Sequence, residues 1–81
     1  MFDCKIDNVL DTQGLYCPDP VMLLHSKIRD MSVGETLLVE ATDPSTVRDI
    51  PKFCMFLGHE LIDHNQVQDV FNYLIRKGPE N

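Results

Sequence analysis

The sequence predicts an α+β fold, a two-layer α/β sandwich in which two helices cover one face of a four-stranded mixed sheet. Three observations support this prediction: two amphipathic helical stripes, the alternating segment ETLLVEAT, and two strand-like segments towards the end of the chain. Together they give the order β-α-β-α-β-β along 81 residues. We therefore expect a single domain over residues 1–81, with a thin core beneath the helices.

The first half of the chain is expected to begin with a strand at residues 5–10, followed by a turn around Gly14. After Cys17 the spacing of the apolar residues becomes that of an amphipathic helix, which ends near residues 32–34. The apolar stripe of this first helix consists of Val21, Leu24, Ile28 and Met31.

The segment ETLLVEAT is the clearest strand, because its apolar and polar side chains alternate except at Leu38. A second helix is expected to begin at DPST, where Asp43 suits the N-cap and Pro44 suits the first helical position. Pro51 removes one backbone donor inside this helix, so we expect a kink or a short break there. The stripe of the second helix, which Gly58 terminates, consists of Val47, Ile50, Cys54 and Leu57.

Two closing strands are predicted at residues 59–64 and 70–77, joined through the polar segment NQVQD. The first of them contains HELID, which nearly matches the zinc signature H-E-x-x-H but has aspartate at position 63. On a strand, His59 and Asp63 would share one face and His64 would lie opposite. We therefore expect no metal site and two solvated histidines. Arg76 and Lys77 end the last strand, where they would protect a sheet edge or contact a partner.

Composition and charge restrict the class of function. The chain is 43% hydrophobic and 25% charged, and its 13 acidic and 7 basic residues give a formal net charge of −6. This charge disfavours direct binding of nucleic acid and suits a basic protein partner. We find no secretory signal and no apolar stretch long enough to span a membrane. Three widely spaced cysteines form no disulfide framework, so we expect free thiols in a reducing cytoplasm.

The segment GLYCPDP places Cys17 where a helix begins. With Cys17 at the N-cap, Pro18 occupies the first helical position, where its missing N–H is not needed, and Pro20 stiffens the first turn. The amides of Asp19 and Val21 then remain as first-turn donors. These donors and the positive end of the helix dipole favour a thiolate at Cys17.

Two considerations oppose a strongly activated thiol. The carboxylate of Asp19, if close, disfavours a second negative charge, and His25 lies about two turns away, so no Cys-His hydrolase is indicated. Cys17 could also be a small buried hydrophobe, as free cysteines often are. However, a connection between a strand and a helix normally lies at the surface, which favours a moderately reactive thiol.

The Cys-Pro-X-Pro motif in GLYCPDPVMLL closely resembles that of the TusA (SirA-like) family of sulfur-carrier proteins. The segments GETLLVEATDP, DPSTVRDIPKFC and YLIRKG are also similar to this family and follow in the same order. The resemblance covers about residues 9–78.

This resemblance implies a β-α-β-α-β-β sandwich and a persulfide carried on Cys17, with Pro18 and Pro20 as its motif partners. It implies a pyridoxal-phosphate cysteine desulfurase as sulfur donor and a downstream sulfur-relay protein as acceptor. In the best-known branch the sulfur becomes the 2-thio group of wobble uridine in certain tRNAs. Branches that serve sulfur oxidation or the molybdenum cofactor remain open. We expect a monomeric carrier without a cofactor of its own.

The chemistry of the motif agrees with such a carrier, because a single exposed thiol has no C-x-x-C neighbour that would expel the bound sulfur as a disulfide forms. A thiol-disulfide oxidoreductase is accordingly disfavoured and would need a couple between Cys17 and Cys54. The alternative class is a non-catalytic adaptor or regulatory module that binds proteins through the same surface. Replacing Cys17 by serine would separate these classes.

Four further residues have two interpretations each. Cys54 lies on the apolar stripe and is expected to be buried and inert, with a resolving thiol as the alternative. Cys4 precedes the family match and is expected to be incidental and partly exposed, with adventitious dimers on oxidation as the alternative. Arg48 and Asp49 are either a solvated pair on the helix surface or a functional group, in which Arg48 lies near Cys17 and favours the persulfide anion or contacts a partner.

Overall fold

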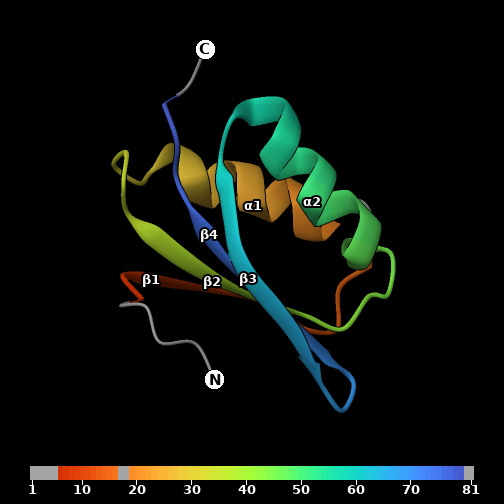
Figure 1. Cartoon of the computed structure of the whole chain (residues 1–81). Coiled ribbons are helices and arrows are strands. Elements are labelled where there is room, and N and C mark those ends of the chain that lie inside the picture. Colours follow the sequence, from red (N-terminus) through yellow and green to blue (C-terminus); the bar gives the residue numbers. More distant parts are fainter. Residues whose placement is uncertain (1–5, 17–18, 80–81) are drawn as a thin grey trace.

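The computed structural model describes residues 6–16 and 19–79. Within them, a four-stranded sheet has the order β1-β2-β4-β3, with β1 (Asn8–Thr12) parallel to β2 (Thr36–Ala41). β4 (Val70–Arg76) runs antiparallel to both β2 and β3 (Glu60–Val67). The helices α1 (Asp19–Arg29) and α2 (Thr46–Leu57) cover the same face of the sheet (Figure 1). The predicted fold class, element order and mixed sheet are therefore confirmed.

The core lies between the two helices and the central strands. Leu24 and Ile28 of α1 and Ile50 and Cys54 of α2 are buried, as their helical spacing predicts. Each buried aliphatic side chain of this kind stabilises the fold by about 1.5–3 kcal/mol. Among the described residues, the buried cluster consists of Leu24, Ile28, Met31, Leu37, Val39, Ala41, Ile50, Phe53, Cys54, Tyr73 and Ile75.

The first strand begins and ends later than predicted. β1 spans Asn8–Thr12 instead of residues 5–10, and Ile6 lies outside it as an exposed residue. The strand continues through polar residues because it pairs in parallel with β2 as far as Ala41. Thr12 is fully buried there, and its hydroxyl donates to the carbonyl of Glu40 at 2.8 Å.

The second helix also begins later than predicted, because Asp43 forms a turn in place of an N-cap. Its carboxylate accepts bonds from the amide and the hydroxyl of Ser45, at 3.0 and 2.8 Å. Ser45 is the residue that precedes the helix, with φ −65° and ψ −20°, and it makes no side-chain cap bond. Gly58 closes the helix in the left-handed conformation, as predicted.

Two details of α2 differ from the prediction. The helix runs without a break from Thr46 to Leu57, so Pro51 removes a donor but does not interrupt it. Val47 is 54% exposed and is not part of the buried stripe, whereas Phe53 is buried. The helix is therefore rotated towards Phe53, and the aromatic ring fills the space between α2 and α1.

The last two strands form a hairpin that is longer than predicted. β3 continues to Val67, so most of the segment assigned to a linker is paired, and Gln68 and Asp69 alone make the turn. Gln68 adopts the left-handed conformation with φ 55°. A register shift between Leu61 and Asp63 leaves the residue between them without a partner on β4.

This bulge changes the faces of the HELID segment. Leu61 pairs with Ile75 and His64 with Tyr73, so both lie on the helical side, whereas Asp63 pairs with Leu74 on the opposite side. His59 lies on the helical side as well, stacked on Phe53 with ring centroids 5.7 Å apart. The prediction that His59 and Asp63 share a face opposite His64 is therefore wrong, because it assumed unbroken alternation.

His59 and Lys77 are buried rather than solvated. The Nδ1 atom of His59 accepts a bond from the amide of Gly78 at 3.0 Å. The ammonium of Lys77 donates to the carbonyl of Met31 at 2.6 Å. Because β4 is a central strand, edge protection does not explain Lys77 or its neighbour Arg76, which pairs with Glu60 at 2.9 Å. His64 is exposed, as predicted.

Candidate functional site

The loop between β1 and α1 leads the chain out of the sheet towards the predicted thiol. The amide of Gln13 donates to the carboxylate of Asp11 at 2.9 Å, and the amide of Leu15 donates to the carbonyl of Thr12 at 3.1 Å. Gly14 adopts φ 84°, a conformation that disfavours other residue types. These local bonds fix the path by which the chain leaves the carboxyl end of β1.

A second loop supports the first from the neighbouring strand. The hydroxyl of Thr42, directly after β2, accepts a bond from the amide of Gly14 at 2.9 Å. Because β1 and β2 are parallel, their carboxyl ends lie at the same edge of the sheet. The connection that contains the Cys-Pro-X-Pro motif therefore lies beside the connection that leads into α2 (Figure 1).

Cys17 and Pro18 lie outside the described residues, so the expected N-cap and first helical position are not described. The residues on either side are both exposed: Tyr16 to 69%, and Asp19 at the first described position of α1. Pro20 is fully buried and anchors the first turn of the helix. The described residues nearest to the motif cysteine on either side, Tyr16 and Asp19, thus lie at the surface.

One expected donor is already used. The amide of Asp19 donates to the carbonyl of Tyr16 at 2.9 Å, so the prediction that it remains open at the helix start is wrong.

Exposed apolar side chains flank the same turn of α1. Met22 is 61% exposed and Leu23 is 39% exposed in the first half of the helix, and Tyr16 is 69% exposed before it; we call these three residues the apolar rim. The rim was not predicted. Its sequence signal is the position of Met22 and Leu23 off the stripe that includes Leu24. Apolar side chains grouped at a surface are typical of contact with a partner.

Arg48 and Asp49 form a pair in the first turn of α2. The Nε atom of Arg48 lies 3.5 Å from Oδ1 of Asp49, and the Arg48 side chain is 70% exposed. Within residues 6–16 and 19–79, Arg48 pairs with no charged group on α1. The pair therefore agrees with the solvated interpretation, and such an exposed pair contributes little to stability.

Cys54 is the cysteine that lies within the described residues, and its surroundings disfavour reaction. Cys54 is buried in the core, and burial raises the pKa of its thiol from 9.0 to about 11. This confirms the expected inert cysteine and disfavours a resolving thiol. Cys4 lies outside the described residues. In the described part of the chain, no three histidine, cysteine or carboxylate side chains are arranged to hold a metal, and no helix has the length and apolarity to cross a bilayer.

Comparison with known proteins identifies the family. The model of a family described as Sulfurtransferase TusA matches residues 8–77. The chain belongs to the TusA family. Two TusA relatives, each named Sulfur carrier protein TusA, are 57% identical to it. The one from Pseudomonas savastanoi pv. phaseolicola aligns over 93% of this chain and 89% of its own, and the one from Pseudomonas aeruginosa PAO1 over 90% and 92%.

A solved structure supports the TusA assignment at the level of the fold. The crystal structure of a SirA-like protein from Desulfitobacterium hafniense superposes with a TM-score of 0.77. It covers 89% of this chain and 99% of its own, at 18% sequence identity. The predicted family is thus confirmed, together with its general class, a sulfur carrier of the sulfurtransferase type.

Proposed function

We propose that residues 1–81 act as one sulfur-carrier domain in which Cys17 accepts and releases a sulfane sulfur as a persulfide. The Cys17 thiolate attacks the outer sulfur of a persulfide on a cysteine desulfurase. A new S–S bond forms at Cys17, the S–S bond of the donor breaks, and the donor cysteine leaves as a thiolate. The acceptor's thiolate then attacks the outer sulfur on Cys17, which leaves as a thiolate in turn. No net oxidation occurs.

The observation that supports this proposal most directly is the position of the Cys-Pro-X-Pro motif within the family match. The motif falls inside residues 8–77, where the connection from β1 enters α1, and the described residues on either side of Cys17 and Pro18, which are Tyr16 and Asp19, are exposed. A persulfide must enter another protein's active site, which a convex strand-to-helix connection permits. Pro18 is proposed to stiffen this connection, as buried Pro20 anchors its helical side.

A carrier must also protect its cargo from internal attack. The described thiol that could attack, Cys54, is buried and remains protonated at neutral pH because burial raises its pKa to about 11. A protonated thiol is a poor nucleophile towards sulfur. This arrangement favours a carrier over a thiol-disulfide oxidoreductase, which needs two cysteines that exchange a bond.

The apolar rim is proposed to contact the donor and the acceptor. Tyr16, Met22 and Leu23 are exposed before and within the first half of α1, and the net charge of −6 suits partners with basic surfaces. We propose a pyridoxal-phosphate cysteine desulfurase as the donor, a thiol of a sulfur-relay protein as the acceptor, and a monomeric carrier in the reducing cytoplasm. Arg48, whose side chain is exposed, is proposed to contact a partner.

The first test is intact-mass spectrometry after incubation with a cysteine desulfurase, pyridoxal phosphate and L-cysteine. Wild type should gain one sulfur atom that a reductant removes. Cys17→Ser should gain none, whereas the matched Cys4→Ser and Cys54→Ser variants should gain it as wild type does. Persulfide that persists in Cys17→Ser would overturn the assignment of the thiol.

The destination of the sulfur is proposed to be the 2-thio group of wobble uridine. A strain that lacks this protein should lose 2-thiouridine from its tRNA, and wild type but not Cys17→Ser should restore it. If Cys17→Ser restored the modification, the protein would act as an adaptor whose thiol is dispensable. If wild type took up sulfur but the tRNA were unchanged, the carrier would serve another branch, such as sulfur oxidation or the molybdenum cofactor.

A further inference from the structure

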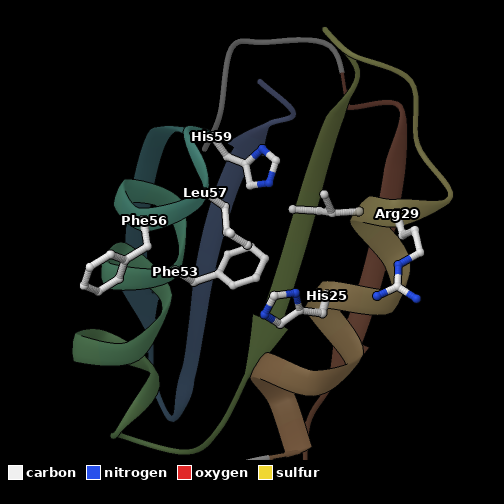
Figure 2. Close-up of a pocket in the computed structure, with 7 residues that line it drawn as sticks. His25, Arg29, Phe53, Phe56, Leu57 and His59 are labelled. Atoms are coloured by element: carbon white, nitrogen blue, oxygen red, sulfur yellow. The ribbon is translucent and has the colours of Figure 1, made fainter. Parts of the chain in front are cut away.

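A pocket lies between the two helices, near their C-terminal ends. It has a volume of about 250 Å³ and is lined from α1 by His25, Ile28 and Arg29, from α2 by Phe53, Phe56 and Leu57, and from the start of β3 by His59. Figure 2 shows the ring of Phe53 between the helices, with His25 beside it and His59 beyond it. The His25 and Phe53 rings meet edge to face, with centroids 4.5 Å apart.

The residues that line the pocket include an arginine and two histidines but no carboxylate. His25 and Arg29 are four residues apart on α1, so they lie on the same face of the helix. Within the described residues, the side chain of Arg29 forms no ion pair. The side chains of Arg29 and His25 also form no hydrogen bond there. Both side chains are exposed, so the guanidinium of Arg29 is accessible to an anion from outside.

Apart from His59, the remaining lining residues are apolar. Ile28 and Phe53 are buried at the base, whereas Phe56 is 78% exposed at the margin on α2. An apolar cavity of about 150 Å³ is sufficient to hold benzene, so this pocket has room for a single aromatic ring with a short polar substituent. An exposed phenylalanine also gains free energy when a ligand covers it.

We propose that this pocket binds an aromatic monocarboxylate. The ring would lie against Phe53 and Phe56, and the carboxylate would accept charge-assisted hydrogen bonds from Arg29 and, when protonated, from His25. Favourable interaction with the C-terminal dipole of α1 explains an arginine in the last turn. It does not explain the unpaired histidine one turn earlier or the exposed aromatic ring on the facing helix.

The pocket is separate from the proposed sulfur site. The Cys-Pro-X-Pro motif ends in the first turn of α1, at Pro20, whereas Arg29 is the last residue of the same helix. Eleven helical residues span about 15 Å. A bound acid would therefore leave the beginning of α1 accessible, and its binding can be tested on protein that carries no sulfur.

The test is a titration of the full chain with 3-phenylpropanoate, followed by amide chemical shifts. We expect saturable shifts at Arg29, Phe56, Leu57 and His59, and binding at least about tenfold weaker for 3-phenylpropanamide, which lacks the charge. Arg29→Gln should weaken binding of the acid by about tenfold. The matched control is Lys52→Gln, which removes the same charge from an exposed position on α2 outside the pocket lining.

A parallel titration with N-acetylphenylalanine distinguishes two sources of the same chemistry. Tighter binding of this compound would identify the C-terminal residue of a polypeptide as the natural ligand, and tighter binding of 3-phenylpropanoate would identify a free acid. The proposal is overturned if the amide binds as tightly as the acid, if Lys52→Gln weakens binding as much as Arg29→Gln, or if no saturable shifts occur. None of these outcomes depends on sulfur transfer, so the two proposals fail independently.

Discussion

Cys54 illustrates how the surroundings of one residue decide its chemistry. Its side chain lies in the core beneath α2, and burial raises the pKa of the thiol to about 11. The raised pKa means that the folded protein keeps this group protonated up to strongly alkaline pH. Because the thiolate is the nucleophile, Cys54 contributes packing and leaves the sulfur chemistry to another cysteine.

Alkylation of a Cys4→Ser/Cys17→Ser double variant isolates this thiol. A pKa of about 11 in place of 9.0 leaves roughly 100-fold less thiolate at pH 8, so native Cys54 should react with iodoacetamide about 100-fold more slowly than a free thiol. The rate should rise until the pH passes about 11, and it should become ordinary when urea unfolds the chain. The Cys4→Ser/Cys54→Ser variant, which retains Cys17, provides the comparison. An ordinary rate for native Cys54 at pH 8 would contradict its burial.

The burial of individual polar side chains was the feature that the sequence predicted least well. Histidine and lysine normally indicate solvent, yet His59 and Lys77 are buried because distant backbone groups, the Gly78 amide and the Met31 carbonyl, bond to them. No local pattern encodes such partners. Cys54, by contrast, was placed correctly because helical spacing alone puts it among apolar neighbours.

At the scale of elements, periodicity predicted each helix and strand, but their ends and faces depended on pairing. β3 extends to Val67 because β4 offers partners along its whole length, and the bulge after Leu61 reverses the faces that simple alternation assigns. The start of α2 was misplaced because the Asp43 carboxylate bonds to Ser45, which forms a turn before the helix. Both errors have the same cause: the sequence pattern does not show which of several possible hydrogen bonds the chain forms.

The segment that follows β4 is fastened to the junction between α2 and β3. Gly78 donates to His59, and Lys77 exchanges backbone bonds with the turn before β2, from its amide to Glu35 and from the amide of Gly34 to its carbonyl. A Cβ atom added to Gly78 would overlap the carbonyl oxygen of Gly58, which is a backbone atom and cannot rotate away. Glycine is therefore required here by close approach of two chain segments.

Gly78→Ala should accordingly destabilise the protein by about 1–3 kcal/mol, because relief of the overlap displaces the segment and breaks the bond to His59. Urea unfolding followed by circular dichroism measures the free energy of unfolding. The control is Pro79→Ala, an exposed neighbour that should change it by less than about 0.5 kcal/mol. Equal stabilities of Gly78→Ala and wild type would show that the segment yields without loss.

At the scale of the whole molecule, the parallel pairing of β1 with β2 brings together two connections that are far apart in the sequence. The bond from the Gly14 amide to Thr42 joins them at one edge of the sheet. The fold class could be predicted because two helical and four strand-like segments permit few two-layer arrangements. The apolar rim and the pocket could not, because each combines side chains whose proximity depends on the packing of the helices.

The net charge of −6 acts over the same scale and determines how quickly partners meet. If the proposed desulfurase presents a basic surface to the beginning of α1, the second-order rate of sulfur loading should fall severalfold as salt rises from about 10 mM to 150 mM. Over this range the Debye length shortens from about 30 Å to about 8 Å. The loading rate at saturating desulfurase should change little, because the transfer step itself occurs within contact distance.

Two variants that each remove one carboxylate locate the origin of this dependence. Asp19 is exposed at the first described position of α1, whereas Asp69 is exposed in the hairpin turn between β3 and β4. Asp19→Asn should flatten the dependence of the loading rate on salt, and Asp69→Asn should leave it close to that of wild type, because screening confines the effect to charges near the contact. Equal slopes for the two variants would show that the total charge steers the encounter, and a rate independent of salt would remove the basic partner from the proposal.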